Sequence, residues 1–293
     1  MASLALITVL YHSDVVLEDF FSSIAIQTHK DYTLYLIDNS FNTKTEQLII
    51  DLTLKYSINA YKHINTGGNI GVAAGNNIGI KRALNDGFND FILLNNDIVF
   101  NQHFLFSEIL HLSNTYKLIT PNILYFGTNK IWMAGGHMDY YRALGVHNGM
   151  GNDNELAPSS GLVTYAPTCF LYIHSAVIES IGLMDEKYFA YYDDTDFILR
   201  CLRKSYLIWY EKSLIVYHKV STSSGGENSP FYAYYGSRNK IYFIRKNFKG
   251  IHKYFLLFYT FITRIGFYIK YNALCKKKLL QGLRDGMMIE LTN

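Results

Sequence analysis

The chain has 293 residues, of which 49% are hydrophobic and 17% are charged, and its formal net charge is +3. This composition excludes a disordered protein, and the length fits one large domain with an appendage. The three cysteines, Cys169, Cys201 and Cys275, lie far apart in the sequence. That spacing argues against a disulfide framework or a thiolate zinc site and indicates a reducing compartment.

Residues 3–94 alternate between segments typical of buried strands and segments typical of helices. Continuous apolar runs predict strands at 3–11, 32–37, 58–65 and 90–94. Helical spacing predicts helices at 15–28, 45–56 and 71–84, the last of them ending at Gly87. The first apolar run has no basic residue before Lys30, so we interpret it as a strand and not as a signal peptide. The alternation predicts an α/β fold with a doubly wound, mostly parallel sheet and flanking helices.

Polar side chains follow three of the expected strands at the point where each strand ends. These clusters are Tyr11-His12, Asp38-Asn39 and Asn95-Asn96-Asp97. In sheets of this kind, ligands bind beyond the carboxyl ends of the strands. The sequence therefore predicts a ligand site where the three clusters converge.

The helix expected at 71–84 begins in a small and polar run that contains Asn69, Asn76 and Asn77. A helix N-terminus attracts phosphate, and glycines permit a close approach of the backbone. The alternative is a helix that needs small residues for tight packing. The three asparagines favour a ligand.

Two acidic clusters are candidates for catalysis. Asp97 stands beside two amides, which suits Mg²⁺ held jointly with phosphates, although capping of the next helix is the alternative. Asp193-Asp194-Thr195-Asp196 opens a helix behind an aromatic run at 188–192. Crowded carboxylates raise one another's pKa, as a general base requires, while acids in a first helical turn are also favoured by the helix dipole.

His218 ends another apolar strand, and Ser223-Ser224-Gly225-Gly226 follows it. A lone histidine is more often structural than a ligand. The small residues after it predict a loop able to close over a bound ligand.

The composition changes near residue 227. Twelve Lys and Arg residues and no acidic residue lie between Glu227 and Asp285. Residues 254–271 are almost wholly apolar and aromatic, but a central Arg264 disfavours a transmembrane helix. Aromatic residues beside lysines favour a helix lying on an anionic membrane surface. Packing on the catalytic domain or in a homodimer interface is the alternative, and the aromatic content disfavours nucleic acid as a partner.

Taken in order, these motifs resemble glycosyltransferase family 2, especially its rhamnosyltransferase-like branch. The resemblance covers about residues 4–240 and rests on Thr8-Val9-Leu10-Tyr11, Ile37-Asp38-Asn39-Ser40, the run 69–80, Leu94-Asn95-Asn96-Asp97, Tyr191-Tyr192-Asp193-Asp194-Thr195-Asp196-Phe197, His218 with Ser223-Ser224-Gly225, and Tyr234-Tyr235-Gly236-Ser237-Arg238-Asn239. It implies a GT-A catalytic domain over 1–240, with a nucleotide-binding half at about 1–100 and an acceptor half at about 101–240. The helical basic and aromatic tail at 241–293 matches nothing in the family's core.

The resemblance also implies roles for individual residues. Asp97 and His218 would bind Mn²⁺ or Mg²⁺, and Asp194, with Asp193 as the other candidate, would deprotonate the acceptor hydroxyl. The family's DxD is reduced here to one acid, and its ED motif is Asp193-Asp194. The nucleotide-diphosphate sugar donor would be held by Thr8, Tyr11, Asp38, Asn39, Asn69, Asn76, Asn77, Asn95 and Asn96.

The implied function is that of an inverting glycosyltransferase in surface polysaccharide synthesis. It would transfer a sugar to a glycan or lipid-linked glycan acceptor while bound peripherally to the inner face of the cell membrane. The pocket that selects the donor is expected in the region 128–161. A catalytically inactive nucleotide-sugar-binding or assembly subunit is the alternative.

Overall fold

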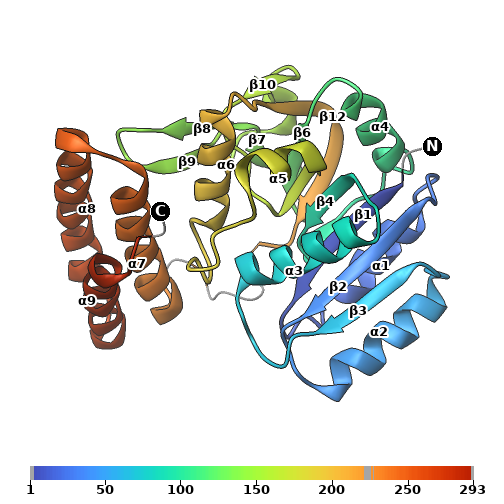
Figure 1. Ribbon diagram of the computed structural model, residues 1–293, viewed down its shortest axis with the longest axis horizontal. Coiled ribbons are helices and arrows are strands. Elements are labelled where there is room, and N and C mark those ends of the chain that lie inside the picture. Colours follow the sequence, from blue (N-terminus) through green and yellow to red (C-terminus); the bar gives the residue numbers. More distant parts are fainter. Residues whose placement is uncertain (1–2, 221–225, 227, 292–293) are drawn as a thin grey trace.

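The computed structural model describes residues 3–220, 226 and 228–291, and it combines an α/β core with a helical C-terminal region (Figure 1). The first half of the core alternates strands and helices as the sequence predicts. Its elements are β1 (Leu4–Leu10), α1 (Leu17–Ala25), β2 (Tyr32–Asp38), α2 (Thr43–Lys55), β3 (Tyr61–Asn65), α3 (Val72–Asn85) and β4 (Asp90–Leu94).

The four strands of this half are parallel, with β1 between β2 and β4 and with β3 beside β2. The predicted elements are all present, although α1 and β3 are shorter than expected. Helix α2 begins before the predicted start because Asn42 caps it, accepting a hydrogen bond from the Thr45 amide at 2.8 Å. Gly87 follows the end of α3 with a φ of 89°, as predicted for a helix stop.

Helix α3 needs small residues because it lies directly on β1. A Cβ atom at Gly75 would stand 2.7 Å from a methyl group of Val9, and one at Gly79 would stand 2.3 Å from a methyl group of Ile7. Side chains at these two positions would force α3 away from the sheet. Tight packing therefore accounts for the glycines of the small and polar run, independently of any ligand.

The second half of the core extends the sheet past β4, in the order β4–β11–β6–β12–β10. Strand β11 is antiparallel to both β4 and β6, which the alternation over residues 3–94 does not predict, whereas β12 is parallel to β6. The predicted α/β fold with a mostly parallel sheet and a helical C-terminal region is confirmed. The elements of this half are β5 (Ile98–Val99), α4 (Leu105–Ser113), β6 (Leu118–Tyr125), β7 (Ile131–Ala134), β8 (Gly136–Asp139), β9 (Leu144–His147), a 3₁₀ turn η1 (Asn154–Leu156), β10 (Gly161–Val163), β11 (Phe170–His174), α5 (Ser175–Ile181), α6 (Asp193–Arg203) and β12 (Ile208–His218).

Three helices follow the sheet: α7 (Pro230–Asn247), α8 (Gly250–Lys270) and α9 (Ala273–Met288). The predicted boundary between residues 240 and 241 falls inside α7, which belongs to both regions. Helix α9 lies against α7 through two glycines, since a Cβ atom at Gly282 or Gly286 would stand 2.4 Å from a carbonyl oxygen of α7.

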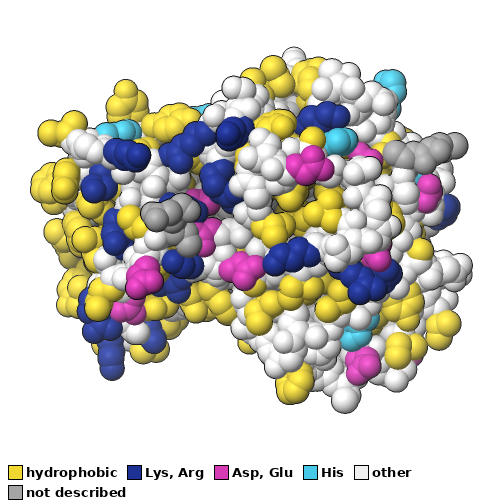
Figure 2. All heavy atoms as spheres, viewed as in Figure 1, with side chains coloured by type: hydrophobic (Ala, Val, Ile, Leu, Met, Phe, Trp, Pro, Cys, Tyr) yellow, Lys and Arg dark blue, Asp and Glu magenta, His cyan; other side chains and the backbone are white. Residues whose placement is uncertain are grey.

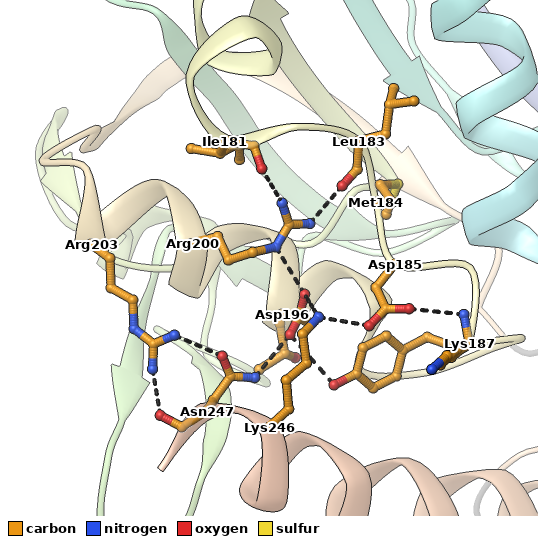
Figure 3. A network of polar contacts seen from close by, with 12 residues as sticks. Ile181, Leu183, Met184, Asp185, Lys187, Asp196, Arg200, Arg203, Lys246 and Asn247 are labelled. Atoms are coloured by element: carbon orange, nitrogen blue, oxygen red, sulfur yellow. Dashed lines mark hydrogen bonds and ion pairs between the residues drawn. The ribbon is translucent and has the colours of Figure 1, made fainter. Parts of the chain in front are cut away.

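A buried polar network fixes α7 to α6 (Figure 3). The carboxylate of Asp196 is fully buried, and it accepts hydrogen bonds from Arg200 at 3.0 Å, from Lys246 at 2.9 Å and from Asn247 at 2.8 Å. Lys246 also donates to Asp185 at 2.6 Å. Because every charge in this group has a partner, burial does not leave an isolated ion, and the α7 end of the C-terminal region is anchored to the core.

Helix α8 turns a broad apolar surface to solvent, at the left edge of the molecule in Figures 1 and 2. Its buried residues are Leu256, Thr260 and Arg264, and Arg264 donates to the carbonyl of Gly236 in α7 at 3.1 Å. We name as the α8 face its large exposed residues, Ile251, Tyr254, Phe255, Phe258, Phe261, Ile262, Ile265, Tyr268 and Ile269. Over the described residues, no helix combines the length and hydropathy needed to cross a membrane.

Candidate active site

The carboxyl ends of β1 and β4 are joined at one edge of the sheet. The side-chain amide of Asn96, just after β4, donates to the carbonyl of Val9 at 2.9 Å and to the hydroxyl of Ser13 at 2.8 Å. Tyr11 lies 40% exposed beside this junction, and β2 ends next to it at Asp38. The predicted convergence of the three polar clusters is therefore confirmed.

Asp38 is fully buried and already has partners within the protein. Its carboxylate accepts a hydrogen bond from the Ser40 amide at 2.8 Å and lies 3.2 Å from Nε2 of His63. Burial by itself raises the pKa of Asp38, but the hydrogen bonds from His63 and Ser40 outweigh it and hold the pKa below its ordinary value. Asp38 is therefore ionised at neutral pH.

Asn39 and Asn69 shape the loop in front of α3. The amide nitrogen of Asn39 donates to the carbonyl of Gly71 at 3.2 Å, and its amide oxygen accepts from the hydroxyl of Thr66 at 2.9 Å. The amide oxygen of Asn69 accepts from the backbone of Gly71 at 3.0 Å. Asn69 lies just before α3 and Asn39 just after β2, as predicted, and their contact with a nucleotide stays a prediction.

Three other predicted nucleotide-binding side chains, those of Thr8, Asn76 and Asn77, are buried. Asn77 exchanges two hydrogen bonds of 2.9 Å with the backbone of Met184, and the amide of Asn76 faces the Met184 sulfur at 3.7 Å. These amides fasten the segment before α6 onto α3, a structural role that sequence reasoning did not anticipate. Direct contact of the three side chains with a nucleotide stays a prediction.

Asp97 and His218 face each other across two paired strands. Strand β5 begins one residue after Asp97 and runs antiparallel to β12, which places His218 opposite Ile98. Oδ1 of Asp97 lies 3.3 Å from Nε2 of His218, and both residues are more than nine-tenths buried. Residues far apart in the sequence thus form one polar pair at the sheet edge, next to Asn95 and Asn96.

This pair fits a divalent metal ion held together with a phosphate-bearing ligand. A carboxylate oxygen and an imidazole nitrogen are suitable ligands for Mn²⁺, and a carboxylate is suitable for Mg²⁺. Among the described residues, no group of three or more His, Cys, Asp and Glu side chains is placed to hold an ion. Within the described part of the chain, Asp97 and His218 are therefore a two-ligand set, and phosphate oxygens and water would complete the coordination.

The turn before α6 is held in an unusual conformation. Tyr191 and Tyr192 have φ angles of 65° and 66°, in the left-handed region that bulky residues rarely occupy. Asn239 in α7 donates to the carbonyls of Ala190 at 2.6 Å and Tyr191 at 3.0 Å, and these bonds stabilise the turn. Strained backbone of this kind concentrates at functional sites, and here it sets the direction from which Asp193 and Asp194 begin the helix.

The two carboxylates at the start of α6 have different surroundings. Asp194 accepts a hydrogen bond from the hydroxyl of Tyr165 at 2.7 Å and one from the amide of Thr195 at 2.6 Å. Asp193 is buried, and burial together with the charge of Asp194 raises its pKa to about 8. Asp193 is therefore largely protonated at neutral pH, while Asp194 is the more accessible of the two.

A row of rings connects the Asp97–His218 pair to Asp194, and sequence reasoning missed it. The Trp132 ring lies edge-on to His218 at 4.5 Å and to His147 at 4.4 Å, and the His147 ring lies 5.9 Å from that of Tyr165. Tyr165 then reaches Asp194. The available signal was that Trp132 is one of only two tryptophans and lies in the region 128–161, where donor selection was expected.

Charged groups at both ends of this row shift the pKa values of His147 and Cys169. Burial lowers the pKa of His147, the charge of Asp194 opposes that shift, and His218 adds to it. Burial raises the pKa of Cys169 well above its ordinary value, and the charges of Asp97 and Asp194 add to that rise. The structure therefore brings together Asp97, His218 and Asp194. The predicted loop Ser223-Ser224-Gly225 lies outside the described residues.

Comparison with known proteins identifies the family of the chain. The model of the family "Glycosyl transferase family 2" matches residues 5–180. The chain belongs to this family.

Two characterised relatives and one solved structure are similar to the chain. The low-salt glycan biosynthesis hexosyltransferase Agl10 of Haloferax volcanii is 26% identical over 244 residues, 81% of this chain and 74% of the relative. The dTDP-rhamnosyl transferase RfbF of Shigella flexneri is 26% identical over 194 residues, 62% of each protein. A mannosyltransferase of Pyrobaculum calidifontis, solved with GDP-Man and Mn²⁺, has a TM-score of 0.58 at 9% identity and covers 97% of this chain and 86% of its own. That likeness shows the fold.

The raised pKa of Asp193 predicts a pH-dependent stability. Between about pH 4 and about pH 8, folded Asp193 keeps a proton that the unfolded chain has released, so the unfolding free energy falls as pH rises through this window. Asn is a neutral mimic of the protonated acid. Asp193→Asn should therefore gain stability over the wild type on going from about pH 5 to about pH 8, as measured by urea unfolding. The exposed Asp153 gives the control Asp153→Asn, and parallel pH profiles for wild type and Asp193→Asn would contradict the prediction.

Proposed function

We propose that this family 2 glycosyltransferase is an inverting, metal-dependent enzyme that transfers a sugar from a nucleoside-diphosphate sugar to a hydroxyl of a glycan or lipid-linked glycan. The observation that carries the proposal is the placement of Asp194 at one end of a row of rings and of the Asp97–His218 pair at the other. An acid–base group and a diphosphate-binding pair are what such a transfer needs at its two ends. Similarity to a hexosyltransferase and a rhamnosyl transferase supports the same reaction class.

In the proposed reaction, the acceptor oxygen forms a bond to the anomeric carbon while the bond from that carbon to the diphosphate oxygen breaks. Asp194 accepts the hydroxyl proton, and the nucleoside diphosphate leaves with the bonding electrons. The hydroxyl of Tyr165 orients Asp194 by its hydrogen bond, as an orienting group does for a general base. Asp193, being largely protonated, does not compete for the proton at neutral pH.

Asp97 and His218 would hold Mn²⁺ or Mg²⁺, and a bound ion would neutralise the charge that develops on the diphosphate. The nucleotide would lie at the edge formed by Tyr11, Asp38, Asn39, Asn69, Asn95 and Asn96. Asp38, Asn39 and Asn96 keep that edge rigid through hydrogen bonds to the chain. Rigid positioning lowers the entropic cost of bringing donor and acceptor into line.

The C-terminal region would hold the enzyme on the inner, anionic face of the cell membrane. The α8 face is apolar and aromatic along its whole length, while Arg264 points away from it into α7. Lysines stand at the ends of the face, at Lys249, Lys253 and Lys270, and in the run 276–278 at the start of α9. A helix with this sidedness suits the interfacial region of a bilayer, where a lipid-linked acceptor would be found.

Substitution of Asp194 tests its role as the general base. Asp194→Asn removes proton acceptance but preserves size, so sugar transfer should fall by about 10²–10⁴-fold while donor affinity is retained. Transfer is measured by nucleotide release in the presence of acceptor, and donor affinity by calorimetry. Asp193→Asn is the matched control and should stay much closer to wild type. Loss of transfer in Asp193→Asn with normal transfer in Asp194→Asn would reverse the assignment. An inactive assembly subunit would turn over no donor in any of the three forms.

Mn²⁺ binding tests the proposed metal site. With Asp97 and His218 as its protein ligands, Mn²⁺ should bind weakly alone and more tightly when nucleoside diphosphate is present. Electron paramagnetic resonance of free Mn²⁺ measures both affinities. Asp97→Ala should remove the tight binding and the transfer activity, whereas Asp153→Ala, an exposed carboxylate elsewhere, should change neither. Full activity in excess EDTA is the outcome that the proposal does not survive.

Charges placed on the α8 face test the proposed membrane binding. The double substitution Phe258→Glu with Ile262→Glu places two charges on the α8 face, and it should abolish co-sedimentation with anionic liposomes at low salt. Leu162→Glu, at an exposed apolar position on β10, is the control and should sediment like the wild type. If the wild type stays in the supernatant, the membrane proposal is wrong. A wild-type dimer that the double substitution dissociates, measured by analytical ultracentrifugation, would instead assign the face to a homodimer.

A further inference from the structure

Apart from Tyr165, the rings between His218 and Asp194 take no part in the proposed proton transfer or in metal binding. Trp132 comes from β7 and His147 from β9, so two strands place them side by side. Their rings are 4.4 Å apart at an interplanar angle of 68°. Both side chains are half-buried, whereas Tyr165 and His218 at the two ends of the row are buried. The middle of the row is thus its accessible part.

The hairpin that carries His147 is packed too closely onto Tyr165 to move freely. A Cβ atom at Gly145 would stand 2.2 Å from the Tyr165 ring, and one at Gly136 would stand 2.5 Å from the carbonyl of Val146 and 2.9 Å from the Tyr165 ring. Glycine is therefore the residue that fits at these two positions. His147 is therefore held at a fixed distance from Tyr165, and through it from Asp194, as a preformed binding site requires.

The His147 imidazole offers a polar atom to a ligand. One ring nitrogen of His147 lies 3.3 Å from the carbonyl oxygen of Trp132, which orients the imidazole. The second ring nitrogen makes no hydrogen bond with any residue that the structure describes. An oriented imidazole nitrogen beside an indole ring offers one directional hydrogen bond next to an apolar surface, the combination that recognises a small polar ring.

The geometry of the proposed reaction identifies the small polar ring that would bind beside Trp132 and His147. In an inverting transfer, the anomeric carbon lies between the departing diphosphate oxygen and the attacking hydroxyl oxygen. The diphosphate belongs at Asp97 and His218, and the hydroxyl at Asp194. The sugar attached to that carbon must then lie along the residues that connect the two ends, and those residues are Trp132 and His147.

We propose that Trp132 and His147 form the subsite for the transferred sugar, with Trp132 covering an apolar face of the sugar ring and His147 hydrogen-bonding to one of its hydroxyls. The subsite rests on the proposed function, because it takes the diphosphate and the acceptor to lie where that function puts them. It makes His147 a specificity-determining residue: donors whose hydroxyl cannot reach the imidazole bind less tightly.

The two tryptophans allow the subsite to be tested by binding alone. Trp209 lies at the far end of β12 from His218 and stacks on Tyr116 at 4.3 Å, so Trp209→Phe leaves Trp132 as the sole tryptophan. The probes are UDP, GDP and dTDP, each compared with its own nucleotide sugars in the presence of Mn²⁺. We expect the nucleotide sugar that binds to change the fluorescence emission of Trp132 more than the matching nucleoside diphosphate does.

Two substitutions then separate sugar recognition from nucleotide binding. Trp132→Leu and His147→Phe should each raise the Kd of the nucleotide sugar about tenfold, while the Kd of the matching nucleoside diphosphate stays within about twofold. Trp209→Phe is the control and should change neither Kd. Retained binding of the nucleoside diphosphate also shows that each variant is folded and that His218 is undisturbed.

The failures of the two proposals differ. If the wild type binds neither nucleoside diphosphate nor nucleotide sugar, the proposed function is wrong and the subsite falls with it. If both bind but the ratio of their Kd values is the same in wild type, Trp132→Leu and His147→Phe, the subsite is wrong and the proposed function stands. A rise in acceptor KM with unchanged donor Kd would also overturn the assignment, because the rings would then serve the acceptor.

Discussion

The antiparallel pairing of β5 with the end of β12 is the contact on which the candidate active site depends. It is short, yet it places His218 beside Asp97 and joins β12 to the segment that follows β4. The amide of Lys219 donates to the carbonyl of Asp97 at 2.9 Å and continues the pairing past His218. The pairing of β12 with β6 also reaches His218, opposite Tyr125, so a second ladder helps to fix the position of the histidine.

The sequence predicts the half of the site that local patterns determine. Buried parallel strands are continuous apolar runs, so β1, β2 and β4 and the polar residues at their ends could be located before the structure. A two-residue strand such as β5 has no periodicity to detect, and the short strands β7 and β9 are little better. Trp132 and His147 were therefore missed, since their place beside His218 is decided by strand pairing and not by their own neighbours in the chain.

Burial is the second quantity that sequence patterns left open. The asparagine side chain can bind a ligand or the backbone, and the sequence did not predict that both amide atoms of Asn77 bond to the backbone of Met184. Arg264 was counted as a charge in the middle of an apolar helix, yet it points into α7 and leaves the α8 face uncharged. In both cases the residue type is consistent with more than one environment, and tertiary packing determines which protein atoms the side chain contacts.

The same packing connects the α8 face to the site. Asn239 of α7 hydrogen-bonds to the turn that begins α6, and Lys246 and Asn247 bind Asp196 one turn of helix beyond Asp193 (Figure 3). Helix α8 also contacts the β8–β9 hairpin, since Nε2 of His252 lies 2.9 Å from the carbonyl oxygen of Tyr140. Tyr140 is at the tip of this hairpin, and His147 is at its opposite end (Figure 1). A membrane bound to the α8 face would therefore have a fixed position relative to both Asp194 and the ring row. An acceptor fixed to that surface would approach Asp194 from one direction, which is the condition for a single linkage to be made.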